Sequence, residues 1–154
     1  QDSALARWQA QATHTGPGLA TARLVLDIGL GIGDDARYQQ LVPPLAAALR
    51  GLSGGDVALG ATRKITQELK LLPVQQQIGQ TGIGVAPELL FALGISGAPQ
   101  HMSWIDPKAV VIAINRDAAA PIFSWHKQNA GPRVIACVGD LQVWLPEPTR
   151  LLSS

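Results

Sequence analysis

The feature of this sequence that most limits its fold is a series of short apolar runs without polar alternation. They are 22–28 (ARLVLDI), 56–61 (DVALGA), 89–96 (LLFALGIS) and 109–115 (AVVIAIN). A strand with one face in water alternates polar and apolar residues, whereas a strand of a parallel sheet is covered on both faces and does not. The runs therefore predict buried strands of a parallel sheet.

The intervals between these runs carry helical signals. Leu41, Leu45 and Leu49 repeat every four residues, which is the spacing of one helical face. Pro43 and Pro44 interrupt this repeat, so the helix either is kinked there or begins there. Strands that alternate with helices indicate an α/β fold with a parallel sheet.

The run 89–96 has two possible interpretations. Pro87 before it and Gly94 inside it would suit a short helix, and a bounded apolar run equally suits a buried strand. We interpret it as a strand, because residues 97–99 can then open a helix with proline in its first turn.

Composition indicates one domain and argues against several function classes. The chain has 154 residues, 15% charged residues and a net charge of +1, so neither nucleic-acid binding nor an anionic membrane is indicated. Its apolar stretches are too short to insert into a bilayer. One cysteine, Cys137, permits no internal disulfide, which fits a reducing compartment. Residues 1–21 lack a lasting period and are interpreted as a tether before a domain at 22–154.

Polar residues gather where the predicted strands end. The carboxyl ends of parallel strands share one edge of the sheet, and such sheets bind ligands beyond that edge. We therefore expect a pocket for a polar, phosphate-bearing ligand, with backbone amides available at a helix start. The residues concerned are Thr62, Arg63, the loop 79–82, Ser96, Gly97, Gln100, His101, Asn115, Arg116 and Asp117.

Other motifs have weaker support. The run 29–33 (GLGIG) resembles a dinucleotide fingerprint, but it lacks the GxGxxG spacing and two aspartates follow it, so a plain turn with a helix cap is preferred. Ser96, His101 and Asp117 have the residue types of a hydrolase triad without the GxSxG elbow. His101 alone suits a ligand contact and a buried structural histidine equally well. One cysteine and three scattered histidines do not favour a metal site.

Several segments, in order and with mostly matching spacing, resemble the alpha subunits of electron transfer flavoproteins. The segments of the family have the sequences GASR, QVGQTG, VAPELY, GISGAIQH, IVAINKD, APIF and VGDLF. The corresponding segments here are 60–63, 77–82, 85–89, 94–101, 111–117, 120–123 and 138–141.

This resemblance implies a Rossmann-like α/β domain with helices on both faces of a parallel sheet, holding FAD in an extended form. It also implies an electron carrier rather than an enzyme. The family takes electrons from flavin dehydrogenases, such as those acting on acyl-CoA, and passes them to a membrane quinone reductase. The implied partner is the beta subunit, in the bacterial cytoplasm or, in a eukaryote, the mitochondrial matrix.

The resemblance assigns roles to individual residues. Arg63 matches an arginine over the flavin ring, Thr81 a hydroxyl near flavin N5, and His101 a donor to flavin O2. A cation at the position of Arg63 favours negatively charged reduced flavin, and the donor at His101 would favour the same form. The other matched cofactor contacts are Thr62, Ile78, Gly79, Gln80, Ser96, Gly97, Ala98, Pro99, Gln100, Asn115 and Asp140.

Two departures from the family leave alternatives open. Leu30 stands where an arginine contacts the cofactor, and Pro99 stands where isoleucine or valine is usual. The lost cation leaves room for a module of this fold with weakened or lost flavin binding. A nucleotide-binding domain of a thiamine or NAD enzyme is a second alternative, and the matches at 80–81 and 96–101 argue against it.

Overall fold

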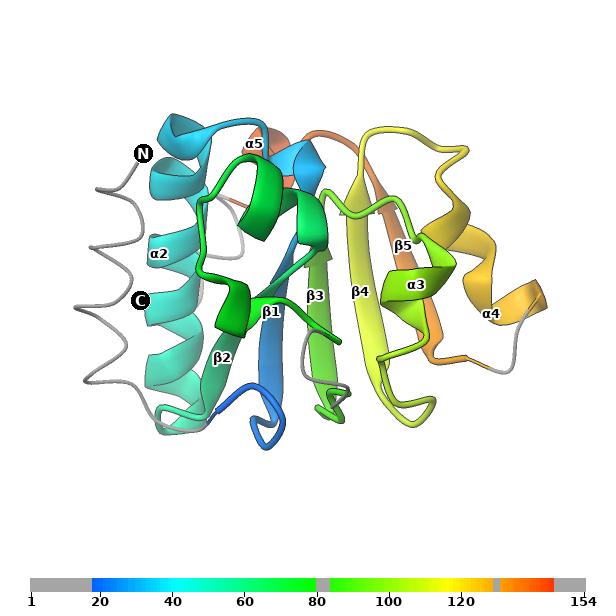
Figure 1. Cartoon of the computed structure of the whole chain (residues 1–154), viewed down its shortest axis with the longest axis horizontal. Helices are drawn as coiled ribbons and strands as arrows, with labels where there is room; N and C mark the ends of the chain where they lie inside the picture. Colours follow the sequence, from blue (N-terminus) through cyan, green and yellow to red (C-terminus); the bar gives the residue numbers. More distant parts are fainter. Residues whose placement is uncertain (1–17, 80–83, 129–130, 146–154) are drawn as a thin grey trace.

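A computed structural model describes residues 18–79, 84–128 and 131–145 (Figure 1). Five strands form one sheet in the order β2-β1-β3-β4-β5, and every neighbouring pair is parallel. The predicted α/β fold with a parallel sheet is confirmed. The strands are β1 (Leu24–Ile28), β2 (Val57–Ala61), β3 (Leu89–Leu93), β4 (Val110–Asn115) and β5 (Arg133–Val138).

The four predicted strands are all present, including β3, for which a helix was the alternative. Strand β5 was not predicted. It lies at the edge of the sheet, and its residues are mostly exposed or half-buried. After Arg133 the run 133–138 (RVIACV) is continuously apolar, so a strand signal was present and the sequence interpretation missed it.

Helix α2 (Asp35–Ser53) begins well before the two prolines, which lie inside it. Asp34 caps its start by accepting a hydrogen bond from the Arg37 amide at 2.9 Å. Each internal proline costs roughly 3 kcal/mol, but seven buried side chains of this helix pack onto the sheet, and each buried Leu contributes about 1.5–3 kcal/mol. Tertiary packing therefore keeps the helix continuous.

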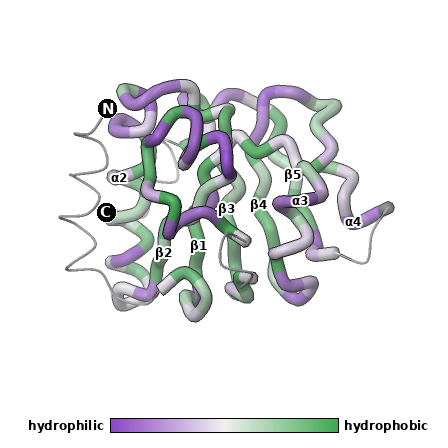
Figure 2. Tube along the Cα trace, viewed as in Figure 1, coloured by the Kyte–Doolittle hydropathy of each residue, from purple (hydrophilic) through white to green (hydrophobic). Residues whose placement is uncertain are grey.

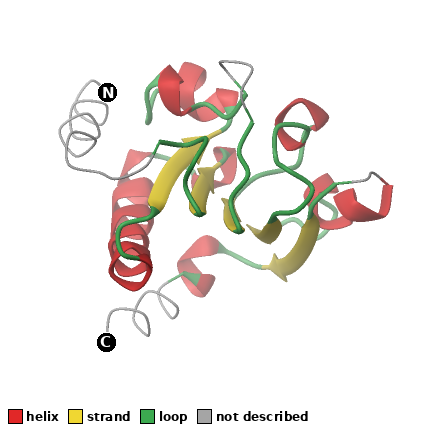
Figure 3. Cartoon of the chain, turned by 90° about the horizontal axis from the view of Figure 1, so that it is seen from below, coloured by secondary structure: helices red, strands yellow, loops and turns green. Residues whose placement is uncertain are grey.

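Helical segments cover both faces of the sheet, as expected (Figure 3). Helix α2 and α5 (Leu141–Trp144) cover one face, over Leu26 and Ile28. The second face is covered by shorter segments: α3 (Pro99–Met102), η4 (Pro121–Ser124) and the loops beside them. Figure 2 shows the apolar residues concentrated along the strands. The other short elements are η1 (Leu30–Ile32), η2 (Lys64–Glu68), η3 (Val74–Gln76) and α4 (Trp125–Gln128). Within the described ranges, no helix is both long and apolar enough to cross a membrane.

Three glycines make a close backbone contact above the carboxyl ends of β1 and β3. The amide of Gly31 donates to the carbonyl of Gly94 at 2.9 Å. Gly94 has φ +71°, and a Cβ atom added to it would lie 2.6 Å from the Cα of Gly31. A Cβ at Gly29 would lie 2.5 Å from the Gly94 carbonyl oxygen. The run 29–33 is thus a turn leading into a capped helix, as preferred, and its glycines are needed for packing.

Replacing Gly94 by alanine should lower the free energy of unfolding by at least ~2 kcal/mol, because it adds left-handed strain and a backbone clash. Gly51→Ala is the control: an added Cβ at this helical position meets nothing within 4 Å. It should raise stability by about 0.5–1 kcal/mol. Urea unfolding of both variants measures the difference, and equal stabilities would show that the two turns are not in tight contact.

Candidate functional site

The segments that follow all five strands meet at one edge of the sheet, which we call the carboxyl edge. Backbone bonds join them: Thr62 N donates to Ile28 O at 3.0 Å, and Gly94 N to Ile114 O at 2.9 Å. Asn115 Nδ2 donates to the carbonyl of Ile95 at 3.0 Å. The predicted convergence of the residues after the second, third and fourth apolar runs is therefore correct.

A buried acid–imidazole pair lies below this edge. Asp27, on β1, is 0% exposed and His101, on α3, is 8% exposed. Asp27 Oδ2 lies 2.5 Å from His101 Nε2. His101 is therefore buried and bonded to a carboxylate. The triad interpretation fails, because the carboxylate at its ring is Asp27, whereas Asp117 accepts from the amide of Ala119.

The Asp27 carboxylate changes the acidity of His101. Burial alone lowers the pKa of the imidazole, but the charge of Asp27 and its hydrogen bond together raise that pKa above the ordinary value. A raised pKa in the folded state means that the pair stabilises the fold below the ordinary histidine pKa, about 6.5. This contribution is lost as the pH rises through the raised pKa.

Arg63 is exposed at the end of β2 and is held by neutral groups. Its Nε atom donates to Gln67 Oε1 at 3.1 Å. Gln67 donates in turn to Gln77 Oε1 at 3.2 Å, and the same oxygen accepts from the Thr66 hydroxyl at 2.7 Å. These amides orient the guanidinium without neutralising its charge. Arg63 is therefore a fixed cation at the carboxyl edge.

Thr62, beside Arg63, carries a buried hydroxyl with no hydrogen-bond partner among the described residues. Buried hydroxyls are almost always paired in folded proteins. An unpaired one at the end of a parallel strand is well placed for a ligand at the carboxyl edge.

Gly97 lets the segment after β3 pass close to the backbone of η4. Gly97 has φ +98°, and a Cβ added there would lie 2.5 Å from the amide nitrogen of Ile122. The carbonyl of Ser96 accepts from that same amide at 2.8 Å. Ser96, Ala98, Pro99 and Gln100 are exposed. Pro99 opens α3 as predicted, but α3 has only four residues, so its start has little of the dipole of a long helix.

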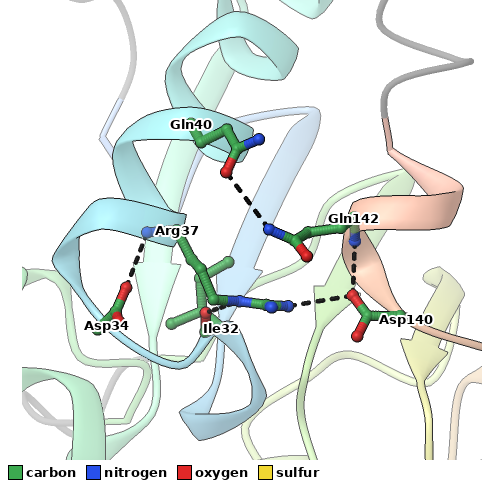
Figure 4. A network of polar contacts seen from close by, with 6 residues as sticks. All are labelled: Ile32, Asp34, Arg37, Gln40, Asp140 and Gln142. Carbon is green, nitrogen blue, oxygen red and sulfur yellow. Dashed lines mark hydrogen bonds and ion pairs between the residues drawn. The ribbon is translucent and has the colours of Figure 1, made fainter.

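Asp140 and Arg37 link α5 to α2 across the carboxyl edge (Figure 4). Asp140 Oδ1 accepts from the Gln142 amide at 2.8 Å and from Arg37 Nη2 at 3.1 Å. Arg37 Nε also donates to Ile32 O at 2.9 Å. The Gln142 amide and the guanidinium of Arg37 hold the pKa of Asp140 below its ordinary value. Asp140, predicted as a cofactor contact, thus also caps a helix.

The glycine-rich loop is described only in part. Ile78 is 4% exposed, and Gly79 has φ +87°, with the Trp104 ring 2.4 Å from the position of a Cβ. Gln80 and Thr81, both predicted cofactor contacts, lie outside the described residues.

The sequence interpretation missed Asp27, Arg37 and Gln77 as residues that organise this edge. Asp27 could have been noticed, because it is a charged residue inside an otherwise apolar run, and buried carboxylates need partners. The contact of Arg37 with Asp140 joins residues 103 positions apart, and no local pattern indicates it.

Comparison with known proteins identifies the family. Residues 18–106 match the model of the electron transfer flavoprotein FAD-binding domain. The chain belongs to this family. Its cofactor is therefore FAD, as the resemblance implied.

Curated relatives agree with this assignment. The chain is 36% identical over 152 residues to the probable mitochondrial electron transfer flavoprotein subunit alpha of Schizosaccharomyces pombe, covering 97% of this chain and 40% of that protein. It is 37% identical to the subunit alpha of Paracoccus denitrificans, covering 96% of this chain and 44% of that protein. It is 40% identical to the mitochondrial subunit of Arabidopsis thaliana, covering 85% and 32%. The chain therefore spans less than half the length of these relatives.

The described residues of the carboxyl edge fit FAD. The unpaired hydroxyl of Thr62 can bond a polar ligand, Arg63 provides a cation oriented by a neutral amide, and His101 adds an imidazole whose pKa is raised by Asp27. These are donors toward a group that becomes negative on reduction.

Thr62→Val should separate ligand binding from stability. Without ligand, removal of an unpaired buried hydroxyl should leave the free energy of unfolding unchanged or raise it by about 1 kcal/mol. FAD affinity should fall by up to about tenfold, because one neutral hydrogen bond is lost. Calorimetric titration and urea unfolding measure the two effects. Thr21→Val is the control, since its exposed hydroxyl contacts only the carbonyl of Gly18; equal FAD affinity in both variants would remove Thr62 from the site.

Proposed function

We propose that this chain holds FAD along its carboxyl edge and serves as the flavin domain of an electron carrier. The observation that supports this most is the presence of Thr62, Arg63 and His101 at one edge: an unpaired buried hydroxyl, a cation held by a neutral amide and an imidazole held by a carboxylate. FAD would supply the acceptance and donation of electrons. The chain's own residues would bind it, orient it and set the charge around it.

Each part of the edge has a distinct proposed task. Arg63 would face the flavin ring, where its charge favours the reduced, negatively charged form. His101, on α3, would donate a hydrogen bond to the flavin ring. The exposed turn after β3, at Ser96–Gln100, would contact the ribityl and phosphate groups, together with Ile78, Gly79, Gln80 and Thr81 of the loop. Asn115 and Asp140 would lie toward the adenosine end.

The partners and setting follow from the family by analogy. We propose pairing with an electron transfer flavoprotein beta subunit, electron input from flavin dehydrogenases such as acyl-CoA dehydrogenases, and output to a membrane quinone reductase. A cytoplasmic location in a bacterium, or the matrix if the source is eukaryotic, is part of the same proposal. So is the division into a tether at 1–21 and a domain at 22–154.

A flavin-weakened module is the second candidate, and Leu30 is the observation that favours it. Leu30 is 45% exposed at the carboxyl edge, so its side chain offers an apolar surface where an arginine of the family contacts the cofactor. We therefore expect the isolated chain to bind FAD weakly.

The decisive test for Arg63 is the potential of bound FAD. Arg63→Ala should lower the reduction potential by roughly 30 mV or more, about 1.4 kcal/mol for a two-electron couple, because loss of a nearby cation destabilises the reduced form. Lys64→Ala is the matched control, since it removes one exposed cation from the next position. Spectroelectrochemical titration of the FAD-loaded chains measures both. If both variants have the wild-type potential, Arg63 does not face the flavin.

Leu30→Arg tests the second candidate. Restoring a cation should tighten FAD binding about ten- to a hundredfold, because a charge-assisted hydrogen bond contributes roughly 1.5–3 kcal/mol. Leu52→Arg, at an exposed position near the far end of α2, adds the same charge elsewhere and should change affinity little. Fluorescence titration with FAD compares them. Equal affinities in the two variants, or nanomolar binding by the wild-type chain, would contradict this explanation.

A further inference from the structure

Strand β1 carries a carboxylate inside the sheet, next to unusually small neighbours. Asp27 pairs in register with Gly60 of β2 and Ala92 of β3, and Ala92 pairs with Ala113 of β4. This row has no large side chain beside the carboxylate. The space above it admits the imidazole of His101, which reaches Asp27 Oδ2 at 2.5 Å.

The carboxylate depends on this imidazole. Asp27 is 0% exposed, and burial of a charge is strongly unfavourable unless the charge is paired. Its second oxygen, Oδ1, has no partner among the described residues. Strands β1 to β4 and η4 carry no other ionisable side chain than Asp27. Among these elements and α3, His101 is therefore the side chain that can balance the charge of Asp27.

Stability alone does not explain the pair. An apolar pair of similar volume is often as stabilising as a buried ion pair, or more so. The carboxylate of the pair also stands near the carboxyl edge, because Asp27 is in register with Gly60 and Ala92, which come two residues before Thr62 and Gly94. A charged imidazole at this place has an effect on a ligand that an apolar side chain would not have.

We propose that Asp27 is a positioning residue that acts through His101: its carboxylate fixes the ring by Nε2 and holds it protonated beneath the cofactor. The proposal rests on the proposed function for its effect on FAD, but the state of His101 can be tested without FAD. The direction of the His101 pKa agrees with it, since the effect of Asp27 exceeds that of burial. Asp27 does not touch the cofactor in this arrangement.

The first experiment is an NMR pH titration of the histidines in the FAD-free chain. His126→Gln and His14→Gln assign the signals and so identify that of His101. His101 should remain protonated above the ordinary histidine pKa, about 6.5. In Asp27→Asn, the buried ring loses its counter-charge, and its pKa should fall below that ordinary value.

Asp106→Asn is the matched control. Among the described residues, its Oδ1 atom accepts from the amide of Lys108, and Asp27 is the carboxylate that shifts the pKa of His101, so the Asp106 variant should leave the His101 titration unchanged. The wild-type titration decides the point even if Asp27→Asn does not fold. A His101 that titrates at or below about 6.5, the ordinary histidine pKa, in the wild-type chain overturns the proposal.

The second experiment measures the reduction potential of FAD bound to the wild-type chain and the two aspartate variants. Asp27→Asn should lower it, because a neutral ring replaces a cation near the reduced flavin, and Asp106→Asn should not. If Asp27→Asn changes the His101 pKa but leaves the reduction potential of FAD unchanged, the proposal that Asp27 acts on the cofactor through His101 is overturned. If no variant binds FAD, wild type included, the proposed function fails, whereas the titration still decides the state of the pair.

Discussion

The close contact between the turns after β1 and β3 is the constraint on which the carboxyl edge depends. Gly31 and Gly94 approach so closely that neither tolerates a side chain, and a hydrogen bond of 2.9 Å joins them. The contact fixes where β1 leads into α2 and where β3 leads toward α3. Leu30, Ser96 and His101 take their places from it. The glycines thus act through packing, and a phosphate-binding role is not needed to explain them.

Charge at the edge is organised in two different ways. Arg37 is paired with a carboxylate, Asp140, and holds α2 to α5. Arg63 is held by Gln67, a neutral amide, so its charge remains available. His101 is intermediate, because Asp27 balances its charge from within the sheet and the ring lies between the carboxylate and the edge. The pairing of Arg37 with Asp140 joins two helices, whereas under the proposed function the charge of Arg63 would face the ligand.

The sequence predicted the fold well where burial is continuous. The runs that became β1 to β4 are covered on both faces, and their apolar composition follows from that. Strand β5 was missed although residues 134–138 are apolar. For α2 the sequence left open whether the helix passes through Pro43 and Pro44 or begins there, and packing carries it through them. The residues of the carboxyl edge were found because each follows a strand. Asp27 and Arg37 were missed because their partners are distant in sequence, and only the folded chain brings them together.

The position of Leu30 raises the question whether another cation replaces the missing arginine. Arg37 is near, but its Nε donates to the carbonyl of Ile32 and its Nη2 to Asp140. Its other N–H groups could still contact a phosphate, but the carboxylate of Asp140 would then lie beside that anion and offset much of the attraction of Arg37. Arg116 also acts on Asp140, yet it corresponds to a lysine in the family segment IVAINKD, so it is not an additional cation. Among the described residues of the carboxyl edge, Arg63 thus holds its charge beside neutral groups, whereas the charge of Arg37 is shared with Asp140. In the proposed orientation, we therefore expect FAD to be bound more strongly at its flavin ring than at its phosphates.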